Sequence, residues 1–282
     1  MRVLFLSNEH RANGQTAYGH RLARLMTALS GQGVETDFVS LRDYGVGRPI
    51  LAQPLAFPFI RRKFAAADFI HAGGNAGYTS GLLRSFTRGQ IVQDIHGDSL
   101  SEAKIKWSNR RDAVSAYWVF QATIADAITY RFGDYFAVVS RPLRAKLTEE
   151  HGIAPDKIGI VRNGVDLATF KTHARPARSS FVVAYAGGFQ HWQGIENLVQ
   201  AAELITDASI RFKIVGFGPG DTTLRSSFAA RLGSRADFVD RVERAELVAH
   251  LSEAHALIIP RPDHAAVEAA FPTKFSEYIA LG

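Results

Sequence analysis

The feature that most limits the possible folds of this chain is an alternation of short apolar runs with stretches of helical spacing. Val3 to Ser7 is apolar and is followed by a polar loop. Apolar residues at positions 17, 22, 25, 26 and 29 then recur at helical spacing, and Val34 to Leu41 alternates as a strand does. A strand, a loop, a helix and a second strand in this order predict parallel neighbouring strands joined by a crossover. We therefore expect an α/β fold.

The same alternation starts again at Phe181–Ala186 and continues through a strand at Ile210–Val215. Between the two series, Lys171–Ser180 has no periodicity and few apolar residues, and we place a linker there. The 282 residues are enough for two domains of ordinary size. We predict two Rossmann-like lobes, residues 1–172 and residues 173–282, with parallel sheets facing a cleft of the kind that often binds ligands.

Composition excludes several classes of function. The chain has no cysteine, which rules out disulfides, thiol catalysis and cysteine metal sites. No apolar run approaches the roughly 20 residues that a membrane span needs, and the first residues are too quickly polar for a signal peptide. The net charge of +6 suits a phosphorylated ligand or an anionic surface, and no nucleic-acid motif accompanies it. We expect a cytoplasmic protein that binds no nucleic acid.

The last stretch, Phe271–Gly282, predicts an anion site. It follows an apolar run, 256–260, that we interpret as a buried strand, and Pro272 suits the first turn of a helix. Thr273 and Lys274 would then lie at a helix N-terminus, where backbone N–H groups and the helix dipole attract an anion. Glu277 would lie about one turn further in, where its carboxylate could accept hydrogen bonds from sugar hydroxyls. Helical spacing places Lys274, Glu277, Tyr278 and Leu281 on one face, and Phe275 and Ile279 on another. An ordinary capped helix with a solvated Lys and Glu is the alternative.

Two further turns bring glycines to strand ends. Gly187–Gly194 follows the strand at Phe181–Ala186, and Gly216–Gly220 follows the strand at Ile210–Val215. Glycines at such turns allow a backbone to approach a pyrophosphate closely. The loop after the first strand contains Gly14 but no Gly-x-Gly-x-x-Gly, so a dinucleotide site of that type is unlikely to lie there.

Several of these segments together resemble the retaining glycosyltransferases of the GT-B fold, family 4 in particular. The resemblance rests on Pro-Thr-Lys-Phe-x-Glu-Tyr-x-Ala-x-Gly at 272–282, on Asn-Gly-Val-Asp at 163–166 and on Val-Gly-x-Gly-Pro at 215–219. It implies that Thr273 and Lys274 hold the diphosphate of a nucleotide sugar and that Glu277 holds its ribose. Asn163 and Gly164 are interpreted as mainly architectural.

The resemblance also implies roles for residues elsewhere in the chain. His96, at the end of the strand that starts at Gln90, would face the reacting sugar. The remaining donor-binding positions would be glycines of the strand-end turns, a loop glutamine and a backbone position near the base: Gly14, Gly187, Gly188, Gln193, Gly216, Gly218 and Val242. The donor would be UDP- or GDP-linked, with no metal or other cofactor needed.

The chain departs from the family pattern at three places. Family members usually carry an Arg and a Lys in the loop that is Gly187–Gly194 here, at the positions of Gly188 and Gln193. They also carry a Glu where this chain has Ala269, beside Glu268. The chain stops at Gly282, where another strand should follow, so we expect an incomplete second lobe, from either a fragment or a naturally short form.

The implied function is transfer of a sugar from a nucleotide sugar to a sugar or lipid-linked acceptor hydroxyl, with retention, in cell-surface polysaccharide or glycoconjugate synthesis. His96, Lys274 and Glu277 are the predicted catalytic residues. One alternative is a non-catalytic nucleotide-sugar-binding or partner subunit, which the missing loop cations support. Another is a sugar-nucleotide epimerase, which would need a pair of acid and base carboxylates that the sequence does not display.

A basic and aromatic helical pattern runs from Lys104 to Arg131, and Arg61–Lys63 adds further positive charge. Two interpretations stay open for this surface: a solvated helix face, or peripheral contact with an anionic membrane at its inner face. Asp98, just before this pattern, could bind the acceptor or cap the next helix, and we favour the cap. Ser140 is interpreted as the N-cap of a later helix.

Overall fold

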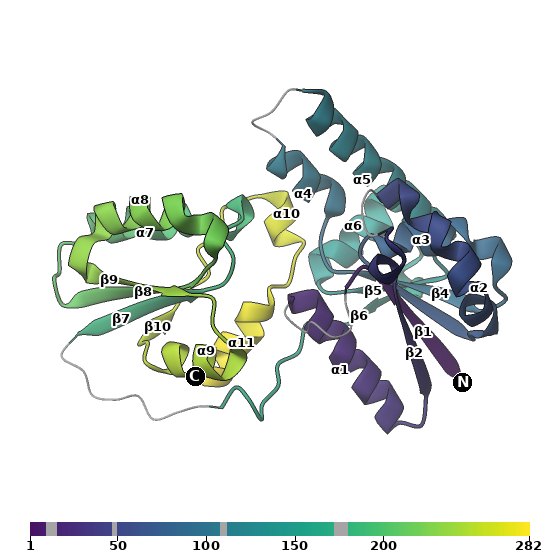
Figure 1. The fold of residues 1–282 in the computed structure, drawn as a ribbon, viewed down its shortest axis with the longest axis horizontal. Coiled ribbons are helices and arrows are strands. Elements are labelled where there is room, and N and C mark those ends of the chain that lie inside the picture. Colours follow the sequence, from purple (N-terminus) through teal and green to yellow (C-terminus); the bar gives the residue numbers. More distant parts are fainter. Residues whose placement is uncertain (10–15, 47–49, 108–111, 172–179) are drawn as a thin grey trace. The chain divides into compact units, whose positions relative to one another are not determined.

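The computed structural model describes residues 1–9, 16–46, 50–107, 112–171 and 180–282. The chain forms two compact units (Figure 1). The first contains Met1–Asn163 and Glu268–Phe271, and the second contains Gly164–Val267 and Pro272–Gly282. The predicted linker falls almost wholly on residues 172–179, which lie outside the described residues, as does the predicted boundary between residues 172 and 173.

The first unit is built on a parallel sheet with the strand order β2-β1-β3-β4-β5-β6. Its strands are β1 (Arg2–Ser7), β2 (Glu35–Ser40), β3 (Phe69–Gly73), β4 (Gln90–Ile95), β5 (Tyr135–Val138) and β6 (Ile158–Ile160). Leu4, Phe5 and Leu6 are at most 1% exposed. Successive buried residues point to opposite faces, so helices cover both faces of the sheet, as is usual for parallel sheets.

Six helices belong to the first unit in its described part. They are α1 (Ala17–Gly31), α2 (Phe57–Ala66), α3 (Ala76–Leu82), α4 (Ser99–Lys106), α5 (Ala113–Phe132) and α6 (Arg141–His151). Side chains cap α1, α4 and α6 at Thr16, Asp98 and Ser140, because each accepts a hydrogen bond from a backbone N–H of the first turn. The predicted caps at Asp98 and Ser140 are thus confirmed.

The prediction of one helical stretch from Lys104 to Arg131 is wrong. The helix α4 ends at Lys106, and α5 begins at Ala113 behind a capping box in which Asp112 and Ser115 bond each other's backbone N–H groups. The capping box was overlooked because the aromatic and basic residues on both sides continue the helical spacing. Within the described residues, no helix is long and apolar enough to cross a membrane.

The second unit is built on a parallel sheet with the order β10-β7-β8-β9. Its strands are β7 (Phe181–Ala186), β8 (Ile210–Phe217), β9 (Ala236–Asp240) and β10 (Ala256–Leu257). Its helices are α7 (Ile195–Leu204), α8 (Thr222–Leu232), α9 (Arg244–Ser252), α10 (Ala265–Glu268) and α11 (Thr273–Leu281), of which α10 ends at the first residue of the segment 268–271 that belongs to the first unit.

The apolar run 256–260, predicted to be a buried strand, is a two-residue edge strand of intermediate exposure. It lies beside β7 only, which leaves its other side without a neighbouring strand in the described sheet. The pairing continues one residue past β10, where the Ile258 N–H donates to Ala184 O at 3.0 Å. Pro260 cannot donate a ladder hydrogen bond, in keeping with the end of pairing there.

Side chains of β7 alternate between two apolar clusters. Val182, Ala184 and Ala186 pack with residues of α9 and α11, whereas Tyr185 packs on the other face with residues of α7 and α8. The carboxyl end of β7 therefore lies between the layer of α7 and the layer of α11. This is the edge at which open parallel sheets bind ligands.

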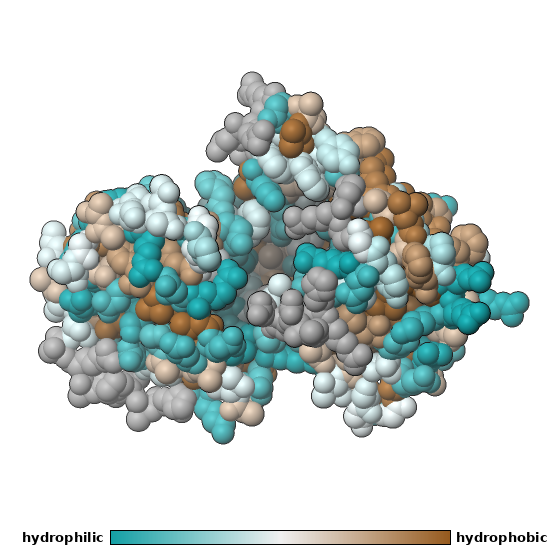
Figure 2. Space-filling view, viewed as in Figure 1, coloured by the Kyte–Doolittle hydropathy of each residue, from teal (hydrophilic) through white to brown (hydrophobic). Residues whose placement is uncertain are grey.

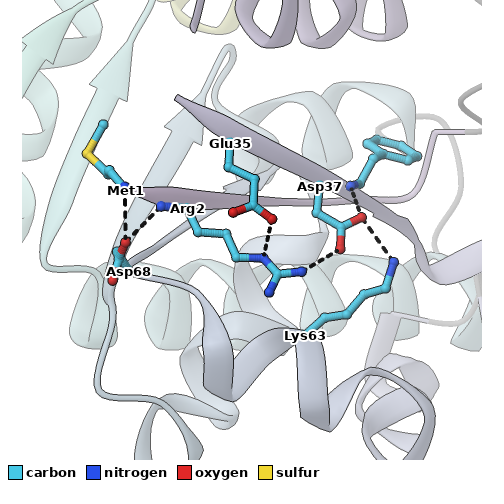
Figure 3. A network of polar contacts seen from close by, with 7 residues as sticks. Met1, Arg2, Glu35, Asp37, Lys63 and Asp68 are labelled. Carbon is cyan, nitrogen blue, oxygen red and sulfur yellow. Dashed lines mark hydrogen bonds and ion pairs between the residues drawn. The ribbon is translucent and has the colours of Figure 1, made fainter. Parts of the chain in front are cut away.

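In the first unit, charged side chains gather where the strands β1, β2 and β3 begin, at the end opposite to their carboxyl ends (Figure 3). Arg2 lies 3.4 Å from Glu35 and 3.6 Å from Asp37, and Lys63 lies 3.0 Å from the same Asp37. The backbone N–H of Arg2 donates to Asp68 at 2.7 Å. Such partly exposed ion pairs each contribute up to about 1 kcal/mol. The network links the amino-terminal ends of β1, β2 and β3. It does not involve the carboxyl ends of these strands, where parallel sheets bind ligands.

Candidate functional site

The loop between β7 and α7 is shaped by two glycines with positive φ. Gly187 has φ +140° and Gly194 has φ +68°, with a short 3₁₀ turn at His191–Gln193 between them. A Cβ at Gly194 would lie 1.9 Å from Pro260 O, and a Cβ at Gly187 would lie 2.3 Å from Lys274 Cε. Position 194 thus requires glycine on grounds of space and conformation, whereas a side chain at Gly187 would be strained by its φ and would displace the end of Lys274.

Lys274, in the first turn of α11, inserts its side chain against this loop. Its Nζ donates to Tyr185 Oη at 2.8 Å and to Gln193 Oε1 at 2.9 Å, and lies 4.1 Å from the centre of the Tyr185 ring. Among the described residues, no carboxylate lies within ion-pair distance of this ammonium. Burial, together with the nearby positive charge of Arg261, lowers the pKa of Lys274 to about 7.

Two helix N-termini belong to this part of the second unit. Gly194 is the N-cap of α7 and Pro272 is the N-cap of α11, and neither provides a side-chain capping hydrogen bond. A helix N-terminus attracts an anion through its N–H groups and its dipole. The ammonium of Lys274 and the two helix N-termini are all groups that favour an anion.

Glu277 lies one turn beyond Lys274 and is 8% exposed. Arg244, the first residue of α9, donates from Nη2 to Glu277 Oε1. The guanidinium of Arg244 also lies 5.1 Å from the centre of the Phe170 ring, which fixes its direction. The buried carboxylate is thus held by one charged hydrogen bond. The predicted helical faces are confirmed, since Glu277, Tyr278 and Leu281 are buried while Phe275 and Ile279 are exposed.

The end of β8 lies directly beside the β7 loop. Gly216 has φ +126°, and a Cβ there would lie 2.4 Å from Gly187 O. Gly218 donates its N–H to Asp221 Oδ2 at 2.8 Å, and a pocket of about 410 Å³ lies next to it, lined partly by Arg225 and Arg241. Val242, predicted to present its backbone to a base, packs its side chain in the core on the α9 and α11 face.

His96 lies in the first unit, just after β4, stacked on Tyr18 with ring centres 4.3 Å apart. Burial lowers the pKa of His96, so its ring is neutral near pH 7. Its Nδ1 has no hydrogen-bond partner within the described residues. Tyr18 fits because residue 73 is glycine: a Cβ there would lie 1.2 Å from Tyr18 Oη.

Below this stack lies a buried ion pair. Arg21 donates from Nε and Nη2 to the two oxygens of Asp94 at 2.9 and 2.8 Å, and Asp94 is 0% exposed. Burial alone would raise the pKa of Asp94, but hydrogen bonds from Arg21 hold that pKa below its usual value. Arg21 also donates to Arg162 O and Asn163 Oδ1, both at 3.3 Å. Arg21 thus makes four hydrogen bonds to oxygen atoms of its own unit.

The structure therefore brings together some of the predicted residues. Gly187, Gly216, Gln193 and Lys274 lie around one loop of the second unit, with Gly188 in the same loop and Thr273 and Glu277 on the same helix as Lys274. His96 belongs to the first unit, and Gly14 lies outside the described residues. Within the described part, no group of three or more metal-ligating side chains forms a cluster.

The sequence analysis did not identify several residues that surround Lys274, Glu277 and His96. Tyr185 lies in an apolar strand, where a polar aromatic residue was the only signal. Asp94 stands two residues before His96 in the motif that drew attention to the histidine, yet its partner Arg21 is 73 positions away. Arg244 and Arg261 were missed because a charged residue at a helix start or in a loop is usually solvated.

Ala269, which stands where the family pattern has a Glu, is a core residue of the first unit. It is 5% exposed and packs with residues of β5 and α6. Its carbonyl oxygen accepts a hydrogen bond from Ser140 Oγ at 2.6 Å. Asn163 Nδ2 likewise donates to Phe271 O at 2.7 Å. These bonds fix the segment 268–271 on the first unit, and they give Asn163 an architectural role.

Comparisons with known proteins cover both units. The family model described as Glycosyltransferase Family 4 matches residues 12–169, and the model described as Glycosyl transferases group 1 matches residues 180–282. A relative from Escherichia coli strain K12, named for colanic acid biosynthesis as the glycosyl transferase WcaI, is 23% identical over 163 residues. That match covers 53% of this chain and 39% of the relative, so the chain corresponds to less than half of that protein.

Solved structures of similar fold span both units. Sucrose-phosphate synthase from Thermosynechococcus elongatus aligns with a TM-score of 0.71 at 17% identity, over 93% of this chain and 76% of that one. Anabaena HepE, solved with UDP and glucose, aligns with a TM-score of 0.60 at 16% identity, over 91% of this chain and 73% of that one. At these identities the likeness shows the fold, two parallel α/β sheets in a GT-B arrangement of elements, and confirms the predicted fold class.

The first of these family models matches more than half of the 282 residues, and this chain therefore belongs to glycosyltransferase family 4, with a second unit of the glycosyl transferases group 1 type.

Proposed function

We propose that this protein transfers a glycosyl group from a nucleotide-diphosphate sugar to an acceptor hydroxyl, with retention of anomeric configuration. The observation that carries the proposal is the setting of Lys274. Among the described residues its ammonium is bonded only to neutral groups, it faces a glycine loop, and it lies at a helix N-terminus. A cation held in this way is suited to a diphosphate, the group that departs in such a transfer.

In the transfer, the bond between the anomeric carbon and the diphosphate oxygen breaks, and its electron pair stays on the diphosphate. The acceptor oxygen bonds to the anomeric carbon, and its proton passes to the departing diphosphate oxygen. Lys274, Thr273 and the N-termini of α7 and α11 would stabilise the charge that develops on the leaving diphosphate. Such stabilisation needs no metal ion, and we propose that the reaction proceeds without one.

The other predicted residues would orient the donor. Glu277 would accept hydrogen bonds from the ribose hydroxyls, and Gly216 and Gly218 would let the backbone approach the nucleoside of a UDP- or GDP-linked sugar. His96, neutral near pH 7, would hydrogen-bond a sugar hydroxyl. Similar proteins with names from colanic acid biosynthesis support a role in making polysaccharide or another glycoconjugate on a sugar or lipid-linked acceptor.

A second candidate function is binding of a nucleotide sugar without turnover. It is favoured by the absence of a charged side chain at Gly188 and Gln193, and by Ala269, whose place in the core of the first unit leaves no room for a ligand-binding carboxylate. This alternative predicts the same affinity for a nucleoside diphosphate but no product with any acceptor.

Calorimetric titration with UDP, GDP and ADP tests the donor site. We expect one nucleotide to bind, with binding lost in Lys274→Ala and Glu277→Ala while both variants stay folded. Binding that both variants retain would contradict the assigned site. Incubation with the matching nucleotide sugars and a panel of acceptors then separates transfer from binding alone. The anomeric coupling constants of the product, measured by NMR, report retention or inversion.

We also propose that the helical hairpin of α4 and α5 rests on an anionic membrane surface. Val114, Tyr117 and Phe120 are 47%, 43% and 55% exposed, and no charged residue occurs between Asp112 and Asp126. Lys104 and Lys106 are close by on α4. Hydrophobic surface follows the side of the first unit on which α5 and α3 lie (Figure 2). Aromatic residues beside lysines suit the lipid headgroup region.

Cosedimentation with vesicles tests this contact. The protein should bind vesicles that contain phosphatidylglycerol and not vesicles of phosphatidylcholine alone. The double variant Tyr117→Ser, Phe120→Ser should bind more weakly by about 30-fold or more, since each aromatic side chain contributes on the order of 1 kcal/mol or more of burial. Leu204→Ser is the control, because Leu204 is 83% exposed on the second unit. Equal losses in both variants would contradict the assignment to α5.

A further inference from the structure

Arg261 is built into the glycine loop of the second unit. Pro260 O accepts a hydrogen bond from Asn197 Nδ2, in the first turn of α7, at 3.1 Å. A Cβ at Gly194 would lie 1.9 Å from Pro260 O and 3.0 Å from Arg261 Cα. The backbone at 260–261 therefore packs directly on the last glycine of the loop and fixes where the arginine side chain starts.

The positive charge of Arg261 affects the pKa values of Lys274 and of its hydrogen-bond partner Tyr185. It lowers the pKa of the Lys274 ammonium, after burial, and it also opposes the rise in the pKa of the Tyr185 hydroxyl that burial causes. Arg261 is thus close enough to Lys274 and Tyr185 for its charge to act on both. The nearby carboxylate of Glu277 is already bonded to Arg244. An anion bound near both residues would be attracted by both charges.

The loop itself offers no positive side chain for that anion. Gly188 and Gln193 stand at the two positions where the resembled family has cations, and the amide oxygen of Gln193 accepts a hydrogen bond from Lys274. Gln193 thus orients the lysine and adds no charge. A diphosphate carries at least two negative charges at neutral pH, so Lys274 alone leaves it incompletely neutralised.

We propose that Arg261 supplies the second positive charge for the diphosphate of the donor, replacing from the segment after β10 the cations that the β7–α7 loop lacks. The proposal rests on the proposed function of the same site. Arg261 and Lys274 then form a pair that grips the diphosphate from two sides of the glycine loop. Arg261 is expected to bond the phosphate oxygens as a planar fork, which a lysine copies only in part.

Titration with a uridine series, or the guanosine series if GDP is the nucleotide bound, tests this role. Arg261→Gln should weaken binding of the nucleoside diphosphate by about 10- to 100-fold, as the loss of a charge-assisted hydrogen bond does, and leave binding of the nucleoside unchanged. Arg261→Lys should recover part of the affinity. Arg211→Gln is the matched control, because Arg211 stands at the start of β8, away from the carboxyl edge, and pairs with Asp237.

A second variant separates a direct role from a structural one. Adding Gln193→Lys to Arg261→Gln should restore diphosphate affinity, because a loop cation returns. In Arg261→Gln alone, the pH at which diphosphate affinity begins to fall should move upward, because Lys274 no longer has a like charge beside it.

Equal weakening of nucleoside and diphosphate binding, or unchanged diphosphate affinity in Arg261→Gln, would overturn the inference. Absence of nucleotide binding by the unaltered protein would instead count against the proposed function itself.

Discussion

Each unit has a buried or partly buried cationic side chain near the carboxyl ends of its strands, Arg21 in the first unit and Lys274 in the second. The two side chains differ in the groups that accept their hydrogen bonds. Arg21 in the first unit makes two hydrogen bonds to the Asp94 carboxylate and two more to the Arg162 and Asn163 oxygens. Lys274 in the second unit is bonded to a phenol and an amide, both neutral. One cation is neutralised by its own chain, and the other is not.

The difference indicates which centre is structural and which binds a ligand. A buried cation that already has a carboxylate partner gains little from a second anion and holds strands and loops in place. A cation without one disfavours the free protein, and that cost is recovered when an anionic ligand arrives. The comparison predicts opposite results when each cation centre is altered, and four experiments test it.

The largest effect is expected for Asp94→Asn. The change leaves Arg21 buried without its carboxylate, which costs about 3–5 kcal/mol. Because the chain has two units, local stability is best measured by hydrogen exchange of the β4 amides. Asp37→Asn provides the comparison, because its ion pairs with Lys63 and Arg2 are partly exposed and their loss should cost about 1 kcal/mol or less. Similar losses in the two variants would contradict a special role for the buried pair.

Lys274→Met should have the opposite result, with a large loss of ligand affinity and no loss of stability. Nucleoside diphosphate affinity should fall by about 100-fold, because the change removes the charge that meets the diphosphate. The free energy of unfolding should stay equal or rise. Burial disfavours the charged form of Lys274 and so lowers its pKa, whereas a methionine of similar length carries no charge. Calorimetry and thermal unfolding measure the two quantities. A large loss of stability in this variant would show that Lys274 is structural, as Arg21 is.

Gly187→Ala tests the fit between the loop and the lysine. The added Cβ would meet Lys274 Cε at 2.3 Å, and residue 187 has φ +140°. We expect a stability loss of about 1–3 kcal/mol from the strained backbone and a diphosphate affinity about tenfold lower, because the lysine must move. Gly220→Ala is the control, since nothing lies within 4 Å of a Cβ at Gly220. Unchanged affinity in Gly187→Ala would separate the loop from the binding site.

Over a single pH unit, the smallest effect expected is a pH dependence. In the free protein the pKa of Lys274 is about 7, below its usual value, and a bound diphosphate favours the ammonium. Above pH 7 binding must take up a proton, so diphosphate affinity should fall by up to tenfold per pH unit. The stability of the free protein should rise between about pH 7 and pH 10.5, because the unfolded chain binds the extra proton there. Lys274→Met should lose both trends.

The sequence predicted the elements well where local signals were strong. The strand at Phe181–Ala186, the cap at Ser140 and the exposed faces of Phe275 and Ile279 follow from apolar runs, short polar side chains and helical spacing. The helix break between Lys106 and Ala113 was missed, because Asp112 and Ser115 form their capping box inside a stretch whose spacing continues on both sides.

The site was predicted only in part, because its contacts are made between distant positions. The Lys-x-x-Glu spacing placed Lys274 and Glu277 on one helix, but Tyr185, which bonds Lys274, is 89 positions away, and Arg244 is 33 positions from Glu277. Periodicity cannot report such pairs. The glycines of the site were easier to predict, because two backbones can approach closely only where a side chain is absent. Gly216 is an example, since a Cβ there would lie 2.4 Å from Gly187 O.

The return of residues 268–271 to the first unit has a practical consequence for dissecting the protein. The chain passes from one unit to the other after Asn163, after Val267 and after Phe271, so no single cut yields two complete units. A piece ending at Asn163 would lack Ala269 and Phe271, which pack with Val139 and Leu143. A piece starting at Gly164 would carry those two apolar side chains without their partners. Separate halves would have to exchange this four-residue segment to recover the cores of the intact protein.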